Sequence, residues 1–119
     1  MMIKELIQEF RKENRKFPAQ MDYYEEDQYC LFHCLHMTRI QEICHAPEFL
    51  RQRNGYILSE ACAGRNFAHN PNETLHLIIF EQLGKSPEHK EVLLESSNIA
   101  CSLHMDFMNH FIFVTIRGW

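Results

Sequence analysis

The chain is predicted to fold as one α+β domain, a three-layer α-β-α sandwich, and three observations in the sequence predict it. Apolar residues recur with a helical period early in the chain and with a period of two after residue 98. A capping residue precedes proline at 70–71 and again at 86–87, which predicts two further helix starts. Segment 111–116 is apolar at nearly every position, and such strands are usually covered on both faces.

The composition indicates a single domain that spans residues 1–119. Hydrophobic residues make up 45% of the chain and charged residues 24%, which leaves enough apolar surface for a core without disulfide bonds. The net charge of −4 argues against a nucleic-acid partner, because a protein that binds the phosphate backbone needs clustered Lys and Arg. We therefore expect a self-contained domain whose partner is not a nucleic acid.

Two further features concern location and redox state. No stretch is apolar for the ~20 residues that a membrane span needs, and the first ten residues lack the uninterrupted apolar block of a signal peptide. We expect no transmembrane segment and a cytoplasmic location as given, or a secreted one if a leader was removed. The five cysteines are an odd number and cannot all pair within one chain, so reduced, buried thiols are the simpler expectation.

The first part of the chain predicts two helices. In the first, four apolar residues lie at i, i+3, i+4 and i+7 with charges between them: Ile3, Leu6, Ile7 and Phe10. The second is predicted to begin after Pro18 with a capping-box pattern, in which Asp22 precedes Glu25 by three residues. It is expected to end near His45, because Pro47 disfavours helical geometry in the residue before it.

The middle of the chain predicts a turn, a strand and a third helix. An Asn-Gly pair at 54–55 predicts a turn, followed by a short strand over 57–62 and a loop at Gly64. Asn70 is predicted to cap a helix that has proline in its first position and ends at Gly84.

The last part predicts one short helix and a hairpin. Ser86 and Pro87 repeat the helix-start signal, and a short helix through Leu94 should follow. The apolar positions of the next segment alternate with smaller or polar ones: Ile99, Cys101, Leu103, Met105 and Phe107. A turn at 108–110 then leads into the final apolar strand.

Two histidines and a carboxylate form the first candidate site. His89 falls at about the third position of its helix, where the positive end of the dipole disfavours the imidazolium form. A neutral imidazole has a lone pair for a metal ion or a proton. With His45 and Glu60 it would form a two-histidine, one-carboxylate set, as in catalytic zinc sites that keep a fourth position for water. Each residue also has a simpler interpretation as a solvated surface side chain.

The stretch CLFHCLHM forms the second candidate site. Cys30, His33, Cys34 and Met37 lie on one stripe of the predicted helix, with His36 on a neighbouring stripe. Cysteine and histidine on one helix could chelate zinc, although a closed site needs further ligands. Core packing is the favoured interpretation, because the stripe continues the apolar face. The H-E-x-x-H and G-x-S-x-G signatures and a Gly-rich phosphate loop are absent from the sequence.

Six stretches follow one another along the chain: LIQEFRKENRKFPAQMD, FHCLHM, CHAPEF, SEACAG, SPEHKEVLL and IACSLHMDFMNHFIFVTIRGW. Taken in this order, they resemble the CAP superfamily, or SCP domain, which includes cysteine-rich secretory proteins, insect venom antigens, plant pathogenesis-related proteins and compact bacterial forms. They are similar to the family's L-I-N-x-x-R opening, H-A-x-x-M stretch, H-S or H-T histidine, G-E-N segment, S-P-G-H-R-x-N-I-L helix and I-G-V-G hairpin with a closing W-T-Q-x-F-G.

This resemblance implies an α-β-α sandwich with a surface cleft, in which two histidines and acidic residues hold a divalent metal in some members, often zinc. Carried over by position, the histidines are His45 and His89, and the first acidic residue is Glu60. The family's second glutamate has no clear match, and Glu81 or Glu88 could take its place.

The sequence therefore predicts a binding module whose cleft takes a metal ion, a peptide or a small polar ligand through His45, Glu60 and His89. A metal-dependent hydrolase or peptidase is the alternative, with a metal-bound water as nucleophile and Glu60 as general base or ligand. A lipid or sterol carrier is a third interpretation, and it would require an apolar groove. The sequence leaves open whether the chain is an enzyme.

Overall fold

The computed structural model describes residues 3–68 and 70–119. The elements in chain order are α1 (Ile3–Glu13), α2 (Tyr24–Ile40), η1 (Glu48–Leu50), β1 (Gln52–Arg53), β2 (Tyr56–Ile57), β3 (Ser59–Asn66), α3 (Pro71–Leu77), η2 (Ile78–Leu83), α4 (Pro87–Glu95), β4 (Ile99–Asp106) and β5 (Phe111–Gly118). The short η1 is a 3-10 turn, and η2 is a π-helical continuation of α3. None of the helices in the described residues is long and apolar enough to cross a membrane.

The main sheet has three antiparallel strands in the order β3-β5-β4. Strand β5 is central, and every residue of it after Phe111 is buried. This confirms the expectation that the last apolar segment is a strand covered on both faces. The predicted hairpin is also confirmed, since β4 and β5 pair antiparallel across a turn.

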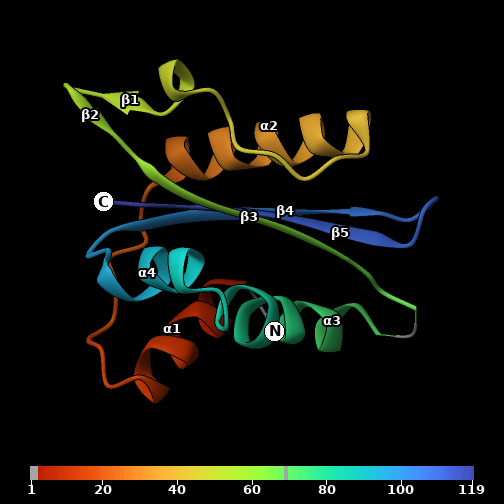
Figure 1. Cartoon of the computed structure of the whole chain (residues 1–119), viewed down its shortest axis with the longest axis horizontal. Helices are drawn as coiled ribbons and strands as arrows, with labels where there is room; N and C mark the ends of the chain where they lie inside the picture. The colour runs from red at the N-terminus through yellow and green to blue at the C-terminus, as the bar shows by residue number, and fades with distance from the viewer. Residues whose placement is uncertain (1–2, 69) are drawn as a thin grey trace.

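Helices lie on both sides of this sheet. Figure 1 shows α2 along one face and α1, α3 and α4 together along the other. The predicted α+β class is therefore confirmed, whereas the identity of this arrangement with the sandwich of the CAP superfamily stays a prediction. The larger apolar core lies on the side of α1, α3 and α4, and a smaller cluster lies under α2.

Helix α1 is the amphipathic helix that the sequence predicts, and its four apolar positions are buried. Its buried Arg11 extends to the end of α4, where Nη1 donates hydrogen bonds to the carbonyl oxygens of Leu93 at 2.7 Å and Ser96 at 2.9 Å. These carbonyls are among the last of α4 and have no partner within the helix. Burial lowers the pKa of the Arg11 guanidinium, although the charge of Glu95 opposes the shift.

Helix α2 ends earlier than predicted. Its last residue is Ile40, so the end that was expected near His45 is wrong. Gln41 has a left-handed backbone (φ 56°), and its N–H donates to the carbonyl of Met37, which stops the helix. The predicted capping box is also absent, because no side chain caps the N-terminus at Tyr23. Residues 42–47 are therefore an irregular connection, and His45 and Ala46 in it contact Glu60 of β3.

The Asn-Gly turn is confirmed and joins β1 to β2. Asn54 and Gly55 both have positive φ, 48° and 86°, as a tight antiparallel turn requires. The strand predicted over 57–62 is instead divided between β2, which pairs with β1, and β3, which pairs with β5 from Ser59 onward. The loop predicted at Gly64 is wrong: this glycine lies inside β3, where a Cβ atom would collide with the Phe111 ring.

The third and fourth helices begin where the sequence predicts. The Asn70 side chain accepts hydrogen bonds from the N–H groups of Asn72 and Glu73, and η2 ends at Leu83, immediately before the predicted stop. Helix α4 begins at Pro87, although the Ser86 side chain makes no capping hydrogen bond.

Candidate functional site

Strands β3 and β5 direct alternate side chains to opposite faces of the sheet, as the period of two requires. The side chains that face α2 are Glu60, Cys62, Phe113, Thr115 and Arg117. Those that face the larger core are Ala61, Ala63, Ile112, Val114 and Ile116. All the polar members of the candidate site therefore lie on the α2 side.

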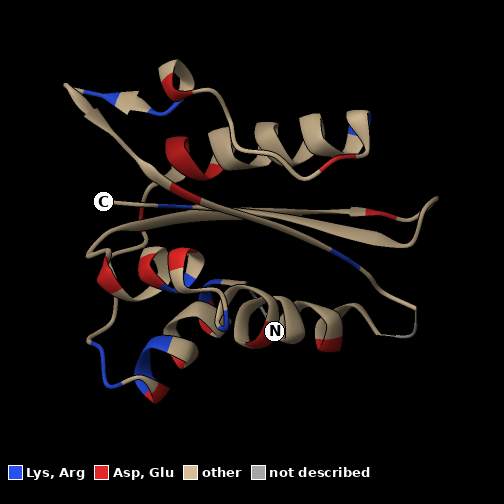
Figure 2. Ribbon diagram, in the orientation of Figure 1, with Lys and Arg blue, Asp and Glu red and all other residues tan. Residues whose placement is uncertain are grey.

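Glu60 is the centre of the polar cluster, and its side chain is fully buried. Its Oε1 accepts a hydrogen bond from the Ala46 N–H at 2.8 Å and lies 3.1 Å from Nδ1 of the exposed His45. Its Oε2 accepts a hydrogen bond from Nε of Arg117 at 3.0 Å. Glu60 and Arg117 are direct partners in the β3–β5 register, and Figure 2 shows the acidic stretch of β3 beside the basic stretch of β5.

The surroundings of Glu60 favour its charged form. Burial alone would raise the pKa of this carboxyl. The hydrogen bond from the Ala46 N–H and the guanidinium of Arg117 outweigh burial, and the pKa lies below its usual value. Glu60 is therefore a carboxylate at neutral pH, held in place by several donors, and it fixes the position of Arg117.

Arg117 is only 2% exposed and its hydrogen bonding is incomplete. Nη1 lies 3.7 Å from Oε2 of Glu26, which is an ion pair but too long for a hydrogen bond. Among the described residues, Nη1 is the one buried side-chain nitrogen or oxygen without a hydrogen-bond partner. A buried donor left unpaired costs about 1–3 kcal/mol, more when it is charged, so this atom has a capacity for an acceptor.

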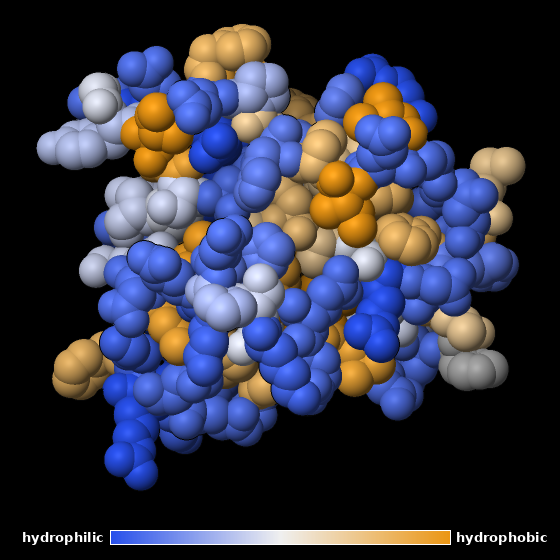
Figure 3. All heavy atoms as spheres, in the orientation of Figure 1, coloured by the Kyte–Doolittle hydropathy of each residue, from blue (hydrophilic) through white to orange (hydrophobic). Residues whose placement is uncertain are grey.

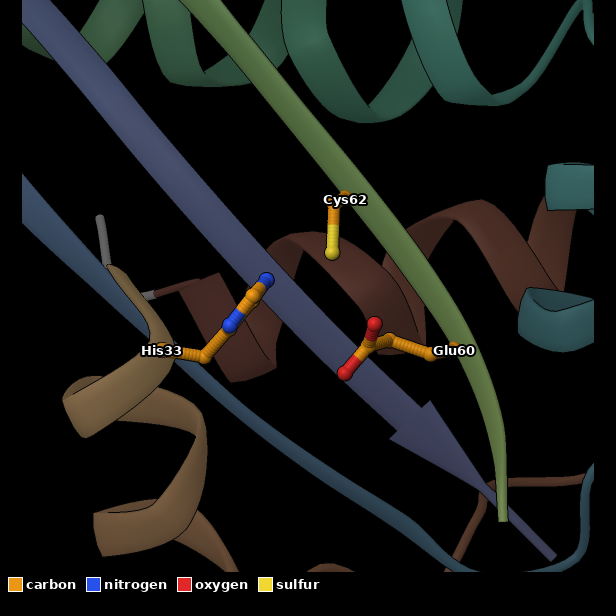
Figure 4. A group of neighbouring side chains, drawn as sticks. All are labelled: His33, Glu60 and Cys62. Carbon is orange, nitrogen blue, oxygen red and sulfur yellow. The ribbon is translucent and has the colours of Figure 1, made fainter. Parts of the chain in front are cut away.

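His33 of α2 approaches Glu60 and Cys62 of β3. Nε2 of His33 lies 2.6 Å from the Cys44 carbonyl oxygen, which can only accept, so Nε2 carries the proton and Nδ1 keeps the lone pair of a neutral ring. One ligand atom from each of His33, Glu60 and Cys62 lies within 4.8 Å of the other two. Figure 4 shows the His33 ring and the Glu60 carboxylate pointing toward each other, with the Cys62 sulfur above them. This buried group could hold a metal ion.

The chemistry of this group fits zinc in kind, because imidazole, carboxylate and thiolate are its usual ligands. Two features oppose binding. Burial raises the pKa of the Cys62 thiol, and the Glu60 charge raises it further, whereas a metal needs the thiolate. The Arg117 guanidinium also holds the carboxylate that the metal would use. A metal ion would have to displace the proton of the Cys62 thiol and compete with the Arg117 guanidinium for the Glu60 carboxylate.

The structure brings together two of the three residues predicted as metal ligands. His45 and Glu60 are in contact, whereas His89 lies in α4, in the layer on the other side of the sheet from α2 (Figure 1). Within residues 3–68 and 70–119, no hydrogen bond or ion pair joins His89 to either partner, and the group of potential ligands does not include it. The reason is that Glu60 points toward α2. Glu81 and Glu88, considered as the second acidic residue, are exposed in η2 and α4 and are not part of the group either.

A groove of about 780 Å³ opens between α2 and the segment 46–53, next to the polar cluster. Its lining is mostly apolar and aromatic: Tyr29, Phe32, His33, His36, Ala46, Pro47, Phe49, Leu50, Arg53 and Arg117. Several of the apolar members are exposed, with Phe49 at 73%. Figure 3 shows apolar side chains exposed at the top of the view, over the segment that carries η1, β1 and β2. His33 and Arg117 supply polar groups to the lining.

Sequence reasoning missed Arg117 and the exposed aromatic residues of α2. The sequence does contain an indication of Arg117, because it is a charged residue inside a strand that is apolar on both faces. Such a residue must have a buried partner. Tyr29 and Phe32 are spaced i, i+3 beside the cysteine stripe, so α2 is apolar on two sides, and one side faces solvent. His33 was noted in the sequence as a possible zinc ligand together with the cysteines of its own helix, with core packing as the favoured interpretation.

Comparisons with known proteins show a likeness in fold. No family model matches the chain, and no curated protein matches it by sequence. Its structure is similar to that of an outer surface protein from Borrelia burgdorferi, with a TM-score of 0.69 at 18% sequence identity. The match covers 98% of this chain and 88% of that chain. At this level of identity, the likeness shows a shared fold alone.

Proposed function

We propose that the chain is a binding module and that its ligand lies in the groove between α2 and residues 46–53. The observation that carries this proposal is an apolar groove with buried polar groups in its lining. Its volume of about 780 Å³ is within the range of small-molecule sites, roughly 300–1,000 Å³. The aromatic side chains supply contact area, and His33 and Arg117 supply hydrogen-bonding groups that fix orientation.

This proposal keeps the predicted binding function and moves the site. The cleft expected between His45 and His89 is replaced by a groove in which Glu60 acts indirectly, by holding Arg117 and the Ala46 N–H. Membership of the CAP superfamily remains a proposal supported by the sequence stretches that resemble it. A short peptide with an aromatic side chain is the other ligand that such a groove would fit.

The groove is tested with 2-naphthalenemethanol, a neutral aromatic probe, in a calorimetric titration. Phe49→Ala removes an exposed wall of the groove, and we expect about tenfold weaker binding, since a lost aromatic contact is worth roughly 1–2 kcal/mol. Phe17→Ala is the matched control, because Phe17 is 90% exposed and does not line the groove. Equal affinities in the two variants would contradict the proposed site.

Zinc binding by His33, Glu60 and Cys62 is a second candidate function, supported by the convergence of their ligand atoms. Calorimetry with zinc should give heat that His33→Ala abolishes and His89→Ala leaves unchanged. Heat that is kept in His33→Ala and lost in His89→Ala would favour the ligand set that the sequence predicts, His45, Glu60 and His89. Absence of heat in the wild type would exclude a metal function for both sets.

Hydrolysis depends on that metal, because the catalytic step needs a metal-bound water. A peptide library incubated with the protein, with and without zinc, tests this alternative. Cleavage that requires zinc and is lost in His33→Ala would support it. An uncut library under both conditions would leave binding as the function.

A further inference from the structure

We infer that the ligand of the groove is an aromatic carboxylate, and that its carboxylate accepts a hydrogen bond from the guanidinium of Arg117. This inference rests on the proposed function, since it names the chemical class of the ligand for that groove.

The first step is the position of the unpaired donor. Arg117 belongs to the lining of the groove, it is almost fully buried, and Glu60 holds its Nε. Nη1 has no hydrogen-bond acceptor within the described residues. A ligand oxygen bound to the guanidinium of Arg117 would supply an acceptor to this incompletely bonded group, and a hydrogen bond between a cation and a carboxylate is roughly twice as strong as a neutral one.

The second step is that Glu26 does not already satisfy this donor. Its Oε2 is 3.7 Å from Nη1, and the carboxylate is held instead by Arg53, through Nε to Oε1 and through Nη2 to Oε2 at 3.2 Å. Arg53 and Arg117 therefore line the groove, and Glu26 and Glu60 bind these two guanidinium groups from behind the lining. A monoanion fits there better than a phosphate dianion, because Glu26 and Glu60 would repel the second negative charge.

The third step is the aromatic body of the ligand. Tyr29 and Phe32 of α2 lie with ring centroids 6.4 Å apart, and the Arg53 guanidinium lies 5.0 Å from the Tyr29 centroid. Phe49 and Leu50 stand exposed on the opposite wall. Planar apolar rings between these walls would gain offset-stacked and edge contacts, which favours an aromatic ligand over a small polar one.

The experiment compares 2-naphthoate with 2-naphthalenemethanol, two probes that share the ring system and differ in the head group. In the wild type we expect at least tenfold tighter binding of the carboxylate. Arg117→Lys should remove most of this preference, because an ammonium group cannot bond Glu60 through one nitrogen and the ligand through another. Binding of the alcohol should weaken much less in that variant, because a neutral hydroxyl gains less from a cationic donor than a carboxylate does.

Glu26→Gln gives a test that does not depend on the folding of an Arg117 variant. Removing the nearest competing carboxylate should strengthen naphthoate binding several-fold and leave the alcohol unchanged. Glu25→Gln is the matched control, since it removes an exposed charge of the same helix turn. No change in naphthoate affinity in Glu26→Gln relative to Glu25→Gln would overturn the inference.

The outcomes separate the two proposals. Equal binding of both probes by the wild type would overturn the carboxylate inference and leave the binding groove in place. Failure of both probes to bind would overturn the groove and the inference together. Tighter naphthoate binding that is unaffected by Phe49→Ala would place the anion outside the groove and would also overturn the inference.

Discussion

The two faces of the main sheet are made by the same strands and have opposite characters. On the side of α1, α3 and α4, twenty of the residues that the structure describes form one buried apolar cluster. Under α2 the apolar cluster has four buried members, and beside them lie Glu60, Arg117 and His33. The difference teaches that a single pair of strands can serve as scaffold on one face and as site on the other, because alternation separates the two sets of side chains.

The faces also depend on different interactions. Burial of apolar area stabilises the scaffold face, and this contribution is insensitive to pH. The site face contains a buried ion pair, which is stable only while both partners are present and charged. The following variants measure that difference.

The largest effect is expected for Glu60→Ala on the site face. Removing one partner leaves the Arg117 charge buried without its carboxylate, and the free energy of unfolding should fall by about 3–5 kcal/mol. Urea denaturation measures the change, and Glu88→Ala, at an exposed carboxylate of α4, is the control. A loss below about 1 kcal/mol, the usual size for a surface ion pair, would show that the pair is not effectively buried.

Leu93→Ala on the scaffold face should cost somewhat less, about 2–5 kcal/mol, because it deletes a fully buried side chain and leaves a cavity. The loss should be the same at neutral and mildly acidic pH. A loss that depends strongly on pH would show that the two faces are energetically coupled.

A smaller effect is expected when the pH is lowered, on the contribution of Glu60 to the free energy of unfolding. The folded-state pKa of Glu60 lies below its usual value, so its contribution to stability is fully present above the unfolded-state pKa of about 4.3 and is lost as the pH falls through the folded-state pKa. The difference in unfolding free energy between wild type and Glu60→Gln should therefore narrow as the pH is lowered from about 4.3 toward the folded-state pKa. A constant difference over that range would contradict the assignment of Glu60 as the charged partner.

The smallest effect is expected for Asn70→Ala, which removes the cap of α3 at the rim of the scaffold face. The Asn70 side chain accepts hydrogen bonds from two N–H groups that water could bond in its place. The free energy of unfolding should therefore fall by about 1 kcal/mol. Thermal unfolding measures it, with Asn72→Ala as a neighbouring control whose side chain does not cap the helix. Equal losses in both variants would mean that the cap hydrogen bonds are not the cause.

Local patterns in the sequence predicted most of the elements. The stripe of α1, the Asn-Gly turn and the Asn70 cap are each specified by residues within a few positions of one another, and the structure confirms them. The end of α2 was misplaced because Gln41 adopts a left-handed backbone, which its side chain does not signal.

The candidate site depends on contacts that local patterns do not specify. Glu60 and Arg117 are 57 residues apart in sequence and meet through the strand register. Sequence reasoning identified Glu60 and His45 correctly as neighbours, but it placed His89 with them. Whether His89 could join them depended on which face of the sheet α4 covers, and neither helical period nor capping residues determine this.

The contact of Arg11 with the end of α4 has a consequence for synthesis of the chain on the ribosome. The acceptor carbonyl of Leu93 lies 82 residues after Arg11, so α1 is translated long before the groups that bind it. During that interval its apolar stripe has no partner from α4 or from β4, and short helices are marginal in water. Docking of α1 on α4 therefore cannot precede the synthesis of nearly the whole chain, and until then the apolar stripe of α1 lacks this cover.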